Sequence, residues 1–235
     1  ICRTERLLAG LSTGLVAVSP RVAEELARAG ATGRHRVAVI PPALDPSPYL
    51  ALARRRPAGE GPVVGWAGRL VPVKDPDLLG RVARRLPGVR FLAAGEGPLL
   101  SEMRDRHPQV RWLGHCGEMA RFYEGLDAFL LTSVNEGVPL VLLEAFAAGV
   151  PVVATPAGGV ADLVEAGRTG LLPPDRKEEN LAALLARLLA DGELGRRLAR
   201  AGREEAAVYA AEKTATRLAT FYRACLAASG RGECP

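Results

Sequence analysis

Two glutamates, Glu136 and Glu144, are separated by seven residues in the segment NEGVPLVLLEA, whose other members are mainly glycine, proline and aliphatic residues. An unpaired buried charge is costly, so each carboxylate needs a partner. The partner can be a ligand, and the two oxygens of Glu144 would suit the hydroxyls of a ribose. The alternative is structural, with Glu136 capping a helix and Glu144 paired with an arginine in the core. The spacing alone supports both interpretations equally.

The residues after Glu136 predict a helix start that can bind an anion. Gly137 has no side chain, so a ligand can approach its backbone, and Pro139 can begin a helix without losing an amide donor. The free amides from Gly137 through Val138 to Leu140 would point outward from the positive end of that helix. This arrangement suits phosphate or sugar oxygens.

Two cations, Arg69 and Lys74, stand five residues apart in the segment GRLVPVKD. Arginine binds an anion in a fork and lysine as a point charge, so together they can hold a doubly charged group such as a diphosphate. The alternative is a pair of solvated surface cations.

The next two acids, Asp75 and Asp77, have the spacing of a metal-binding carboxylate pair. A helix start explains them better, with Asp75 as the N-cap, Pro76 at the first helical position and Asp77 in the first turn. We therefore predict no metal site here.

Two further segments, AGEGP and GHCGE, give weaker signals. Gly95 and Gly97 allow either a tight turn or the close approach of a ligand. The pattern lacks the third glycine of a dinucleotide fingerprint, and the chain has no P-loop sequence. His115 either lines the site or lies at the surface. No Ser-His-Asp or Cys-His arrangement can be argued from the sequence.

Each of these loops follows an apolar run, and from residue 62 such runs alternate with helical patterns. The runs are not interrupted by polar residues, which is typical of a parallel sheet covered on both faces. The predicted fold class is α/β, a doubly wound, Rossmann-like parallel sheet. Ligands of such sheets bind beyond the carboxyl ends of the strands, so the loops should share one edge. The strands are expected at residues 62–68, 90–95, 110–114, 127–133 and 151–155.

The part before this alternation contains a predicted strand, a helix and a second strand. Ser19 fits the N-cap of the helix and Gly30 its end. Residues 41–62 consist largely of proline, alanine, arginine and glycine with little periodicity, which indicates a linker and a domain boundary. From residue 177 the pattern is helical.

The composition narrows the class of protein. Of the 235 residues, 48% are hydrophobic, 24% charged and 5% aromatic, as in a globular protein with an aliphatic core. The net charge of +5 comes mainly from dispersed arginines, with no basic block interleaved with aromatics, so we predict no nucleic-acid partner. An anionic ligand or an acidic membrane surface fits this charge. Four cysteines without CxxC spacing indicate free thiols in a reducing cytosol.

Together these segments resemble the donor-binding half of a retaining, nucleotide-sugar-dependent glycosyltransferase of the GT-B fold, in the group 1 family. The likeness extends from ERLLAGLSTGLVAVSPRVAEEL to the end of the chain. NEGVPLVLLEA is its most specific part and resembles the family's motif of two glutamates separated by seven residues. The segments GRLVPVKD, AGEGP and GVPVVATPAGGVADLVEAGRTGLLPP match in order and spacing.

The resemblance implies a role for each matching residue. Arg69 and Lys74 would bind the donor diphosphate and stabilise the charge on the leaving group, so they count with Glu136 as catalytic. Glu136 would contact the sugar near the reacting carbon, and Glu144 would bind the ribose. The loop that carries His115 would lie along the base. The predicted donor-binding residues are Arg69, Lys74, Gly95, His115, Glu136, Gly137, Val138, Pro139, Leu140 and Glu144.

The resemblance also implies a domain organisation. Residues 1–45 would be the last elements of a truncated N-terminal, acceptor-binding domain, followed by a linker at 46–62. Residues 63–207 would form the nucleotide-sugar-binding domain and 208–235 a C-terminal helix and tail. The glycine-rich loop and catalytic histidine of the acceptor half are absent from the sequence, so the fragment alone is expected to be inactive. The usual glycine after the lysine is replaced by Asp75.

The expected partners are a nucleotide-diphosphate-sugar, an acceptor of unknown type (glycan, lipid or small molecule) and the missing N-terminal domain. The donor is a substrate, and neither a cofactor nor a metal is expected. Because the chain begins with Ile and shows no signal peptide and no apolar run of about 20 residues, we expect a piece of a longer cytoplasmic protein. Association with the inner face of a membrane is a further expectation. A nucleotide-sugar 2-epimerase and a non-catalytic nucleotide-sugar-binding module are alternative functions.

Overall fold

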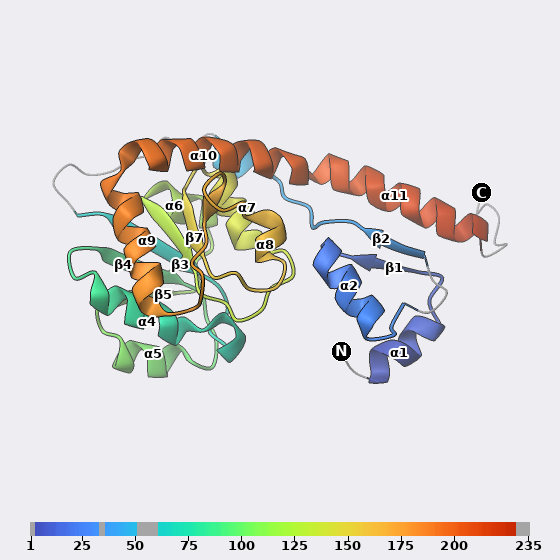
Figure 1. The fold of residues 1–235 in the computed structure, drawn as a ribbon, viewed down its shortest axis with the longest axis horizontal. Helices are drawn as coiled ribbons and strands as arrows, with labels where there is room; N and C mark the ends of the chain where they lie inside the picture. Colours follow the sequence, from blue (N-terminus) through green and yellow to red (C-terminus); the bar gives the residue numbers. More distant parts are fainter. Residues whose placement is uncertain (1–2, 33–35, 51–60, 229–235) are drawn as a thin grey trace.

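A six-stranded parallel sheet forms the centre of the larger part of the molecule (Figure 1). The computed structural model describes residues 3–32, 36–50 and 61–228. The strands lie in the order β5-β4-β3-β6-β7-β8, and every neighbouring pair is parallel. They are β3 (Val63–Ala67), β4 (Arg90–Ala94), β5 (Val110–Gly114), β6 (Ala128–Leu131), β7 (Val152–Ala154) and β8 (Gly170–Leu171).

Both faces of this sheet are buried, which explains the unbroken apolar runs. Successive side chains of a strand point to opposite faces. In β3, Val63 and Ala67 belong to one apolar cluster, whereas Val64 and Trp66 belong to a second cluster. A strand between two cores cannot alternate with polar residues, so the predicted α/β, doubly wound, Rossmann-like fold is confirmed.

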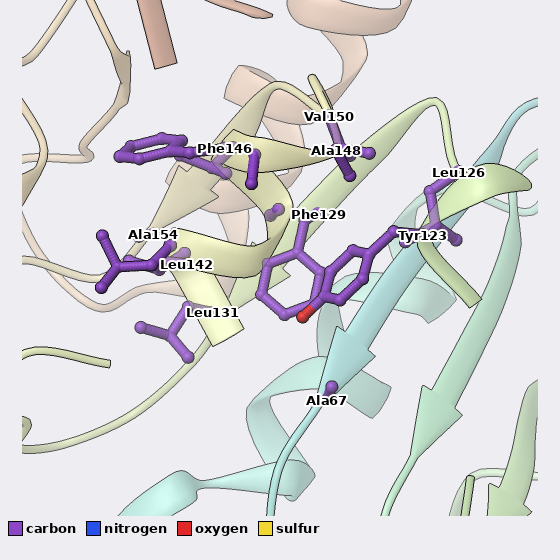
Figure 2. Packing of buried hydrophobic residues seen from close by; sticks show 14 of the residues in the cluster. Ala67, Tyr123, Leu126, Phe129, Leu131, Leu142, Phe146, Ala148, Val150 and Ala154 are labelled. Atoms are coloured by element: carbon purple, nitrogen blue, oxygen red, sulfur yellow. The ribbon is translucent and has the colours of Figure 1, made fainter. Parts of the chain in front are cut away.

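Helices on the two faces complete the two cores. The helices that contribute to the first cluster include α6, α7 and α8. Figure 2 shows how Tyr123 of α6 lies beside Phe129 of β6, and their ring centroids are 5.6 Å apart. The helices of the second cluster include α4, α5 and α9. The helices of this part are α4 (Pro76–Arg85), α5 (Leu100–Arg106), α6 (Met119–Glu124), α7 (Leu140–Ala147), α8 (Val160–Leu163), α9 (Glu178–Ala190) and α10 (Gly192–Ala206), with 3₁₀ turns η1 (Pro72–Lys74) and η2 (Ala207–Tyr209).

The N-terminal part is a small two-stranded parallel sheet with its helices. Ser19 caps α2, because its side chain accepts a hydrogen bond from the amide of Val22 at 3.2 Å, and Gly30 follows the helix at φ +65°. Both predicted helix boundaries are thus confirmed. The elements are α1 (Arg3–Gly10), β1 (Gly14–Ala17), α2 (Pro20–Arg28) and β2 (Arg36–Val39). The short α3 (Ser47–Leu50) follows them and packs against α6 and α7 of the larger part.

The last helix, α11 (Ala211–Ala228), returns to this small sheet (Figure 1). A Cβ atom on Gly14 would lie 2.7 Å from the ring of Phe221 and 2.8 Å from the Sγ of Cys225, so the glycine lets helix and strand pack closely. Within the predicted linker at 46–62, α3 buries Tyr49, and residues 51–60 lie outside the described residues. None of the helices in the described ranges is both long and apolar enough to cross a membrane.

Candidate functional site

The order of the strands makes β3 and β6 the topological switch point of the sheet, and the region between the loops that follow these two strands is called the crevice below. These two neighbours are far apart in the sequence, and the chain leaves them toward opposite sides of the sheet. Ligands of open α/β sheets bind outside the carboxyl ends of the strands at such a switch point. The loop after β3 carries Arg69 and Lys74, and the loop after β6 carries Glu136. The two strongest signals of the sequence therefore flank one crevice.

Lys74 and Glu136 form an ion pair across this crevice. The ammonium nitrogen lies 2.5 Å from Oε1 of Glu136, and the Ser133 hydroxyl donates to the same oxygen at 2.6 Å. The side chain of Glu136 is only 9% exposed, and that of Lys74 is 25% exposed. Glu136 does not cap α7, so the structural alternative considered for it is wrong. Ser133, which the sequence analysis missed, is recognisable only as a hydroxyl three residues before the acid at a strand end.

The loop around Glu136 is clamped by the glycine pair that follows β7. The amide of Gly159 donates to the carbonyl of Glu136 at 2.8 Å. A Cβ atom on Gly158 would clash with that same carbonyl, and one on Gly159 would clash with the carbonyl of Gly137. Gly158 also has φ +55°, which disfavours any other residue. The two glycines thus allow one loop to lie directly on the other and fix the position of Glu136.

Replacing Gly158 by alanine is expected to lower the melting temperature more than the same change at Gly167. Both residues have positive φ, so each variant places an alanine in the left-handed region of backbone conformation. This conformation costs about 1–2 kcal/mol of stability in either variant. Only at Gly158 does the added methyl also meet protein atoms, whereas nothing lies within 4 Å of the site at Gly167. Thermal unfolding of both variants measures the difference. Equal melting temperatures would show that the clamp is not tight.

The N-terminus of α7 offers free amides beside Glu136. In the part of the chain that the structure describes, the amides of Gly137, Val138, Leu140 and Val141 donate to no backbone acceptor, and no side chain caps the helix. Pro139 is the N-cap residue (φ −74°, ψ 114°), not the first helical residue as predicted, and has no amide to contribute. These amides and the helix dipole together favour an anion.

Glu144 lies one turn into α7 and is held by tyrosines. The hydroxyl of Tyr123 donates to Oε2 of Glu144 at 2.9 Å. Burial raises the pKa of Glu144, although the hydroxyls of Tyr123 and Tyr49 act to lower it. Burial first, and then the charge of Glu144, raises the pKa of both tyrosines. The predicted alternative of a core arginine partner is therefore wrong, and both tyrosines were missed because aromatic residues in helices look like core.

Arg69 and His115 are exposed at the same edge of the sheet. Among the described residues, the side chain of Arg69 has neither a hydrogen-bond nor an ion-pair partner. The two cations of the first loop therefore differ, because Lys74 is held by Glu136 and Arg69 is free to meet a ligand. His115 follows β5, two strands away from the crevice.

Gly95 and Gly97 have a structural explanation. Gly95 has φ +137° and Gly97 has φ +157°. A Cβ atom on Gly95 would clash with the carbonyl of Gly68, and one on Gly97 with the backbone of Leu70. The amide of Leu70 also donates to the carbonyl of Glu96 at 2.8 Å. The glycines therefore let the loop after β4 support the loop that carries Arg69 and Lys74.

Asp75 and Asp77 both act in protein contacts. Oδ1 of Asp75 accepts from the amide of Leu78 at 3.1 Å, which confirms the predicted N-cap of α4. Asp77 lies 2.7 Å from Nε2 of His107, which is fully buried, and it also contacts Arg106. Burial acts to raise the pKa of Asp77, but the hydrogen bonds from His107 and Arg106 outweigh it and the pKa is lowered. Both carboxylates therefore already have hydrogen-bond partners within the protein.

Comparison with known proteins shows which family of proteins this chain resembles. A model described as glycosyl transferases group 1 matches residues 61–191. A D-inositol 3-phosphate glycosyltransferase of Mycobacteroides abscessus is 37% identical over an alignment of 183 residues that covers 70% of this chain and 40% of that protein. The protein of the same description from Mycobacterium marinum is 32% identical over an alignment of 180 residues that covers 70% of this chain and 38% of that protein. The chain thus spans about two fifths of these curated relatives.

Solved structures share the fold over nearly the whole chain. Sucrose-phosphate synthase from Thermosynechococcus elongatus has a TM-score of 0.85 and 25% identity, covering 95% of this chain and 61% of that one. Anabaena HepE, solved with UDP and glucose, has a TM-score of 0.82 and 23% identity, with 95% and 68% covered. These likenesses extend over the small N-terminal sheet as well as the large one.

Proposed function

Because the chain belongs to the group 1 glycosyl transferase family, we propose that it is the donor-binding part of a retaining, nucleotide-sugar-dependent glycosyltransferase. The whole protein would transfer a sugar from a nucleotide-diphosphate-sugar to an acceptor with retention of anomeric configuration. The acceptor-binding domain would be supplied by another part of the protein. This chain alone would hold the donor without turning it over.

One observation carries the proposal: Lys74 and Glu136 meet at the switch point of the sheet, beside the free amides of α7. A cation, a carboxylate and a positive helix end in one crevice match the parts of a nucleotide-sugar, which has a diphosphate, a sugar and a ribose. That HepE has been solved with UDP and glucose supports a nucleotide-sugar donor.

The transfer step builds negative charge on the departing diphosphate as the bond to the anomeric carbon breaks. Arg69 and Lys74 would bind the diphosphate and stabilise this charge, since fixed cations are worth most where charge develops in the transition state. Lys74 is neutralised by Glu136 in the free protein. We propose that the donor diphosphate replaces Glu136 as the partner of Lys74, which releases the carboxylate for the sugar.

The remaining roles follow the same assignment. Glu136 would contact the sugar near the reacting carbon, and Glu144 would accept hydrogen bonds from the ribose. The amides of Gly137, Val138 and Leu140 would hold sugar or phosphate oxygens. The loop with His115 would lie along the base, and the loop with Gly95 would line the crevice beside Arg69. No cofactor is proposed besides the donor substrate, and membrane association stays a proposal for the whole protein.

The proposal is tested on the full-length protein with UDP-, GDP- and ADP-sugars. The donor that binds should raise the melting temperature by mass action, and incubation with acceptors should give transferred sugar in the donor's anomeric configuration. Free epimeric sugar would show a 2-epimerase instead. Binding of a donor by the full-length protein without any product would indicate a non-catalytic module.

We expect the transfer reaction to be independent of divalent metal. The charge of the leaving diphosphate would be balanced by Arg69 and Lys74, while Asp75 and Asp77 are engaged by the fold. Activity of the full-length protein should therefore survive excess EDTA. Complete loss of activity, with recovery on adding Mg²⁺ or Mn²⁺, would contradict the assignment.

Replacing Glu144 by glutamine should raise the KM for the donor by about tenfold, because a hydrogen bond to a charged group is worth about 1.5–3 kcal/mol. The kcat should change little, since the ribose is bound alike in ground and transition states. Glu212→Gln, at an exposed glutamate of α11, is the control. An unchanged donor KM would remove Glu144 from the donor site.

The same variant tests the effect of burial on Glu144. Its pKa in the folded protein is raised, so the parent loses stability as pH rises through that value, whereas glutamine cannot ionise. The melting temperature of the variant relative to the parent should therefore increase from pH 4 to pH 7. A difference that is the same at both pH values would show that Glu144 titrates as it does in the unfolded chain.

A further inference from the structure

Asp75 has an unusual backbone conformation next to the proposed diphosphate ligand Lys74. In the ranges that the structure describes, it is the one residue other than glycine with positive φ, at φ +45° and ψ 61°. An L-residue is strained in this left-handed region and persists there where the surroundings hold it. Such strain is common at functional sites, where contacts with neighbouring residues maintain it.

The carboxylate of Asp75 has two partners. Oδ1 caps α4 through the amide of Leu78, and Oδ2 accepts a hydrogen bond from the guanidinium of Arg176 at 2.6 Å. Arg176 lies 101 residues further along the chain, in the segment between β8 and α9. The side chains of the pair are 34% exposed for Arg176 and 21% exposed for Asp75, so solvent screens their interaction only in part.

Arg176 also contacts Thr132, the residue that directly follows β6. The same guanidinium nitrogen donates to the carbonyl of Thr132 at 3.1 Å. The hydroxyl of Thr132 in turn donates to the carbonyl of Lys74 at 2.9 Å and accepts from the indole of Trp66 at 2.9 Å. Arg176 therefore joins the loop that carries Lys74 to the strand whose following loop carries Glu136.

This arrangement is unfavourable in two ways. Asp75 is strained, and Nε of Arg176 is buried without a hydrogen-bond partner among the described residues. A buried donor without a partner is costly, so stability alone does not explain the pair. Local rules of this kind are broken most often where function requires a fixed geometry.

We propose that Arg176 is a positioning residue for the donor diphosphate, which acts through Asp75 and Thr132 to hold Lys74 at the crevice. The proposal rests on the proposed function, because Lys74 needs such a fixed place only if it binds a diphosphate. The contacts fix the backbone that directly follows the Cα of Lys74, since Thr132 holds the carbonyl of Lys74 and Arg176 holds the next residue, Asp75. Lys74 itself remains the group that touches the ligand.

The test compares a nucleoside diphosphate with its monophosphate on the full-length protein. Whichever of UDP, GDP or ADP the parent binds is titrated by calorimetry, together with the corresponding UMP, GMP or AMP. Arg176→Gln should weaken diphosphate binding by about tenfold and monophosphate binding by about twofold or less, because only the diphosphate reaches Lys74. Adding Arg176→Gln to Lys74→Ala should cause no further loss, since residues that act as one unit are not additive.

Two further variants keep the test decisive. Asp75→Gly adopts positive φ without strain, so it should fold and show the same selective loss even if Arg176→Gln does not fold. Arg203→Gln removes another guanidinium contact, to the carbonyl of Ala148 at 3.2 Å, and should leave the ratio of the two affinities unchanged.

Two results would overturn the proposal, and they are distinguishable. If diphosphate and monophosphate affinities change equally, or neither changes, in Arg176→Gln and Asp75→Gly, the pair is structural and only this inference fails. If the parent binds none of the three nucleoside diphosphates, the proposed function fails and this inference with it.

Discussion

Replacing Lys74 by alanine is expected to lower the donor-dependent turnover of the full-length protein by about 10–100-fold, because a charged hydrogen bond is worth about 1.5–3 kcal/mol. The variant should also melt at a lower temperature than the parent. It leaves the carboxylate of Glu136, 9% exposed, with only the hydroxyl of Ser133 as a side-chain partner within the described ranges. Initial rates at varied donor concentration and thermal unfolding measure the two effects.

Arg69→Ala separates ligand binding from stability. Arg69 is exposed and its side chain has no partner in the described part of the chain, so this variant should lose diphosphate affinity by about tenfold while its melting temperature stays that of the parent. Arg197→Ala, at an exposed arginine of α10, is the matched control. Nucleoside monophosphate binding should change less in both site variants. Equal diphosphate binding by the parent, Arg69→Ala and Lys74→Ala would refute the assignment of these cations.

Replacing Glu136 by glutamine is expected to lower kcat by at least about tenfold with little change in the donor KM. Removal of an interaction made mainly in the transition state lowers kcat, whereas loss of uniform binding raises KM. The amide keeps the size of the side chain and can still accept from Ser133, so the fold should be retained. Binding of a nucleoside diphosphate without sugar should not weaken, because Lys74 loses the carboxylate that competes for it.

The control for this variant is Glu204→Gln, at an exposed glutamate of α10 that pairs with Arg200. It should leave kcat unchanged. The assignment of Glu136 to the reacting sugar fails if Glu136→Gln melts far below the parent while its folded fraction keeps full kcat. In that case the Lys74–Glu136 pair would be a structural contact between two loops.

The fold and the edge that carries the site were predictable from the sequence, because they depend on local patterns. Uninterrupted apolar runs separated by helical segments specify a covered parallel sheet, and the loops after such strands must share one edge. Asp75 as the cap of α4 and Ser19 as the cap of α2 were also predictable. Both involve a side chain and an amide three residues apart, which sequence spacing determines directly.

The partners of the charged side chains were decided only by the tertiary structure. Lys74 and Glu136 are 62 residues apart in the chain, and Arg176 and Asp75 are 101 apart. Whether side chains from two loops meet depends on the strand order and on the exact path of each loop. The path of the loop that carries Glu136 is set by its close contact with Gly158. Spacing along the chain carries no information on these distances.

Glu144 also shows that the sequence does not reveal which side chains meet in the folded protein. Its place in an apolar helix indicated that it needed a partner, and that inference was correct. The nature of the partner depended on which helices pack together, and the contact of α3, α6 and α7 supplied Tyr49 and Tyr123 rather than an arginine. The sequence by itself determined that acids lie at the sheet edge, and the packing of distant elements decided what each acid touches.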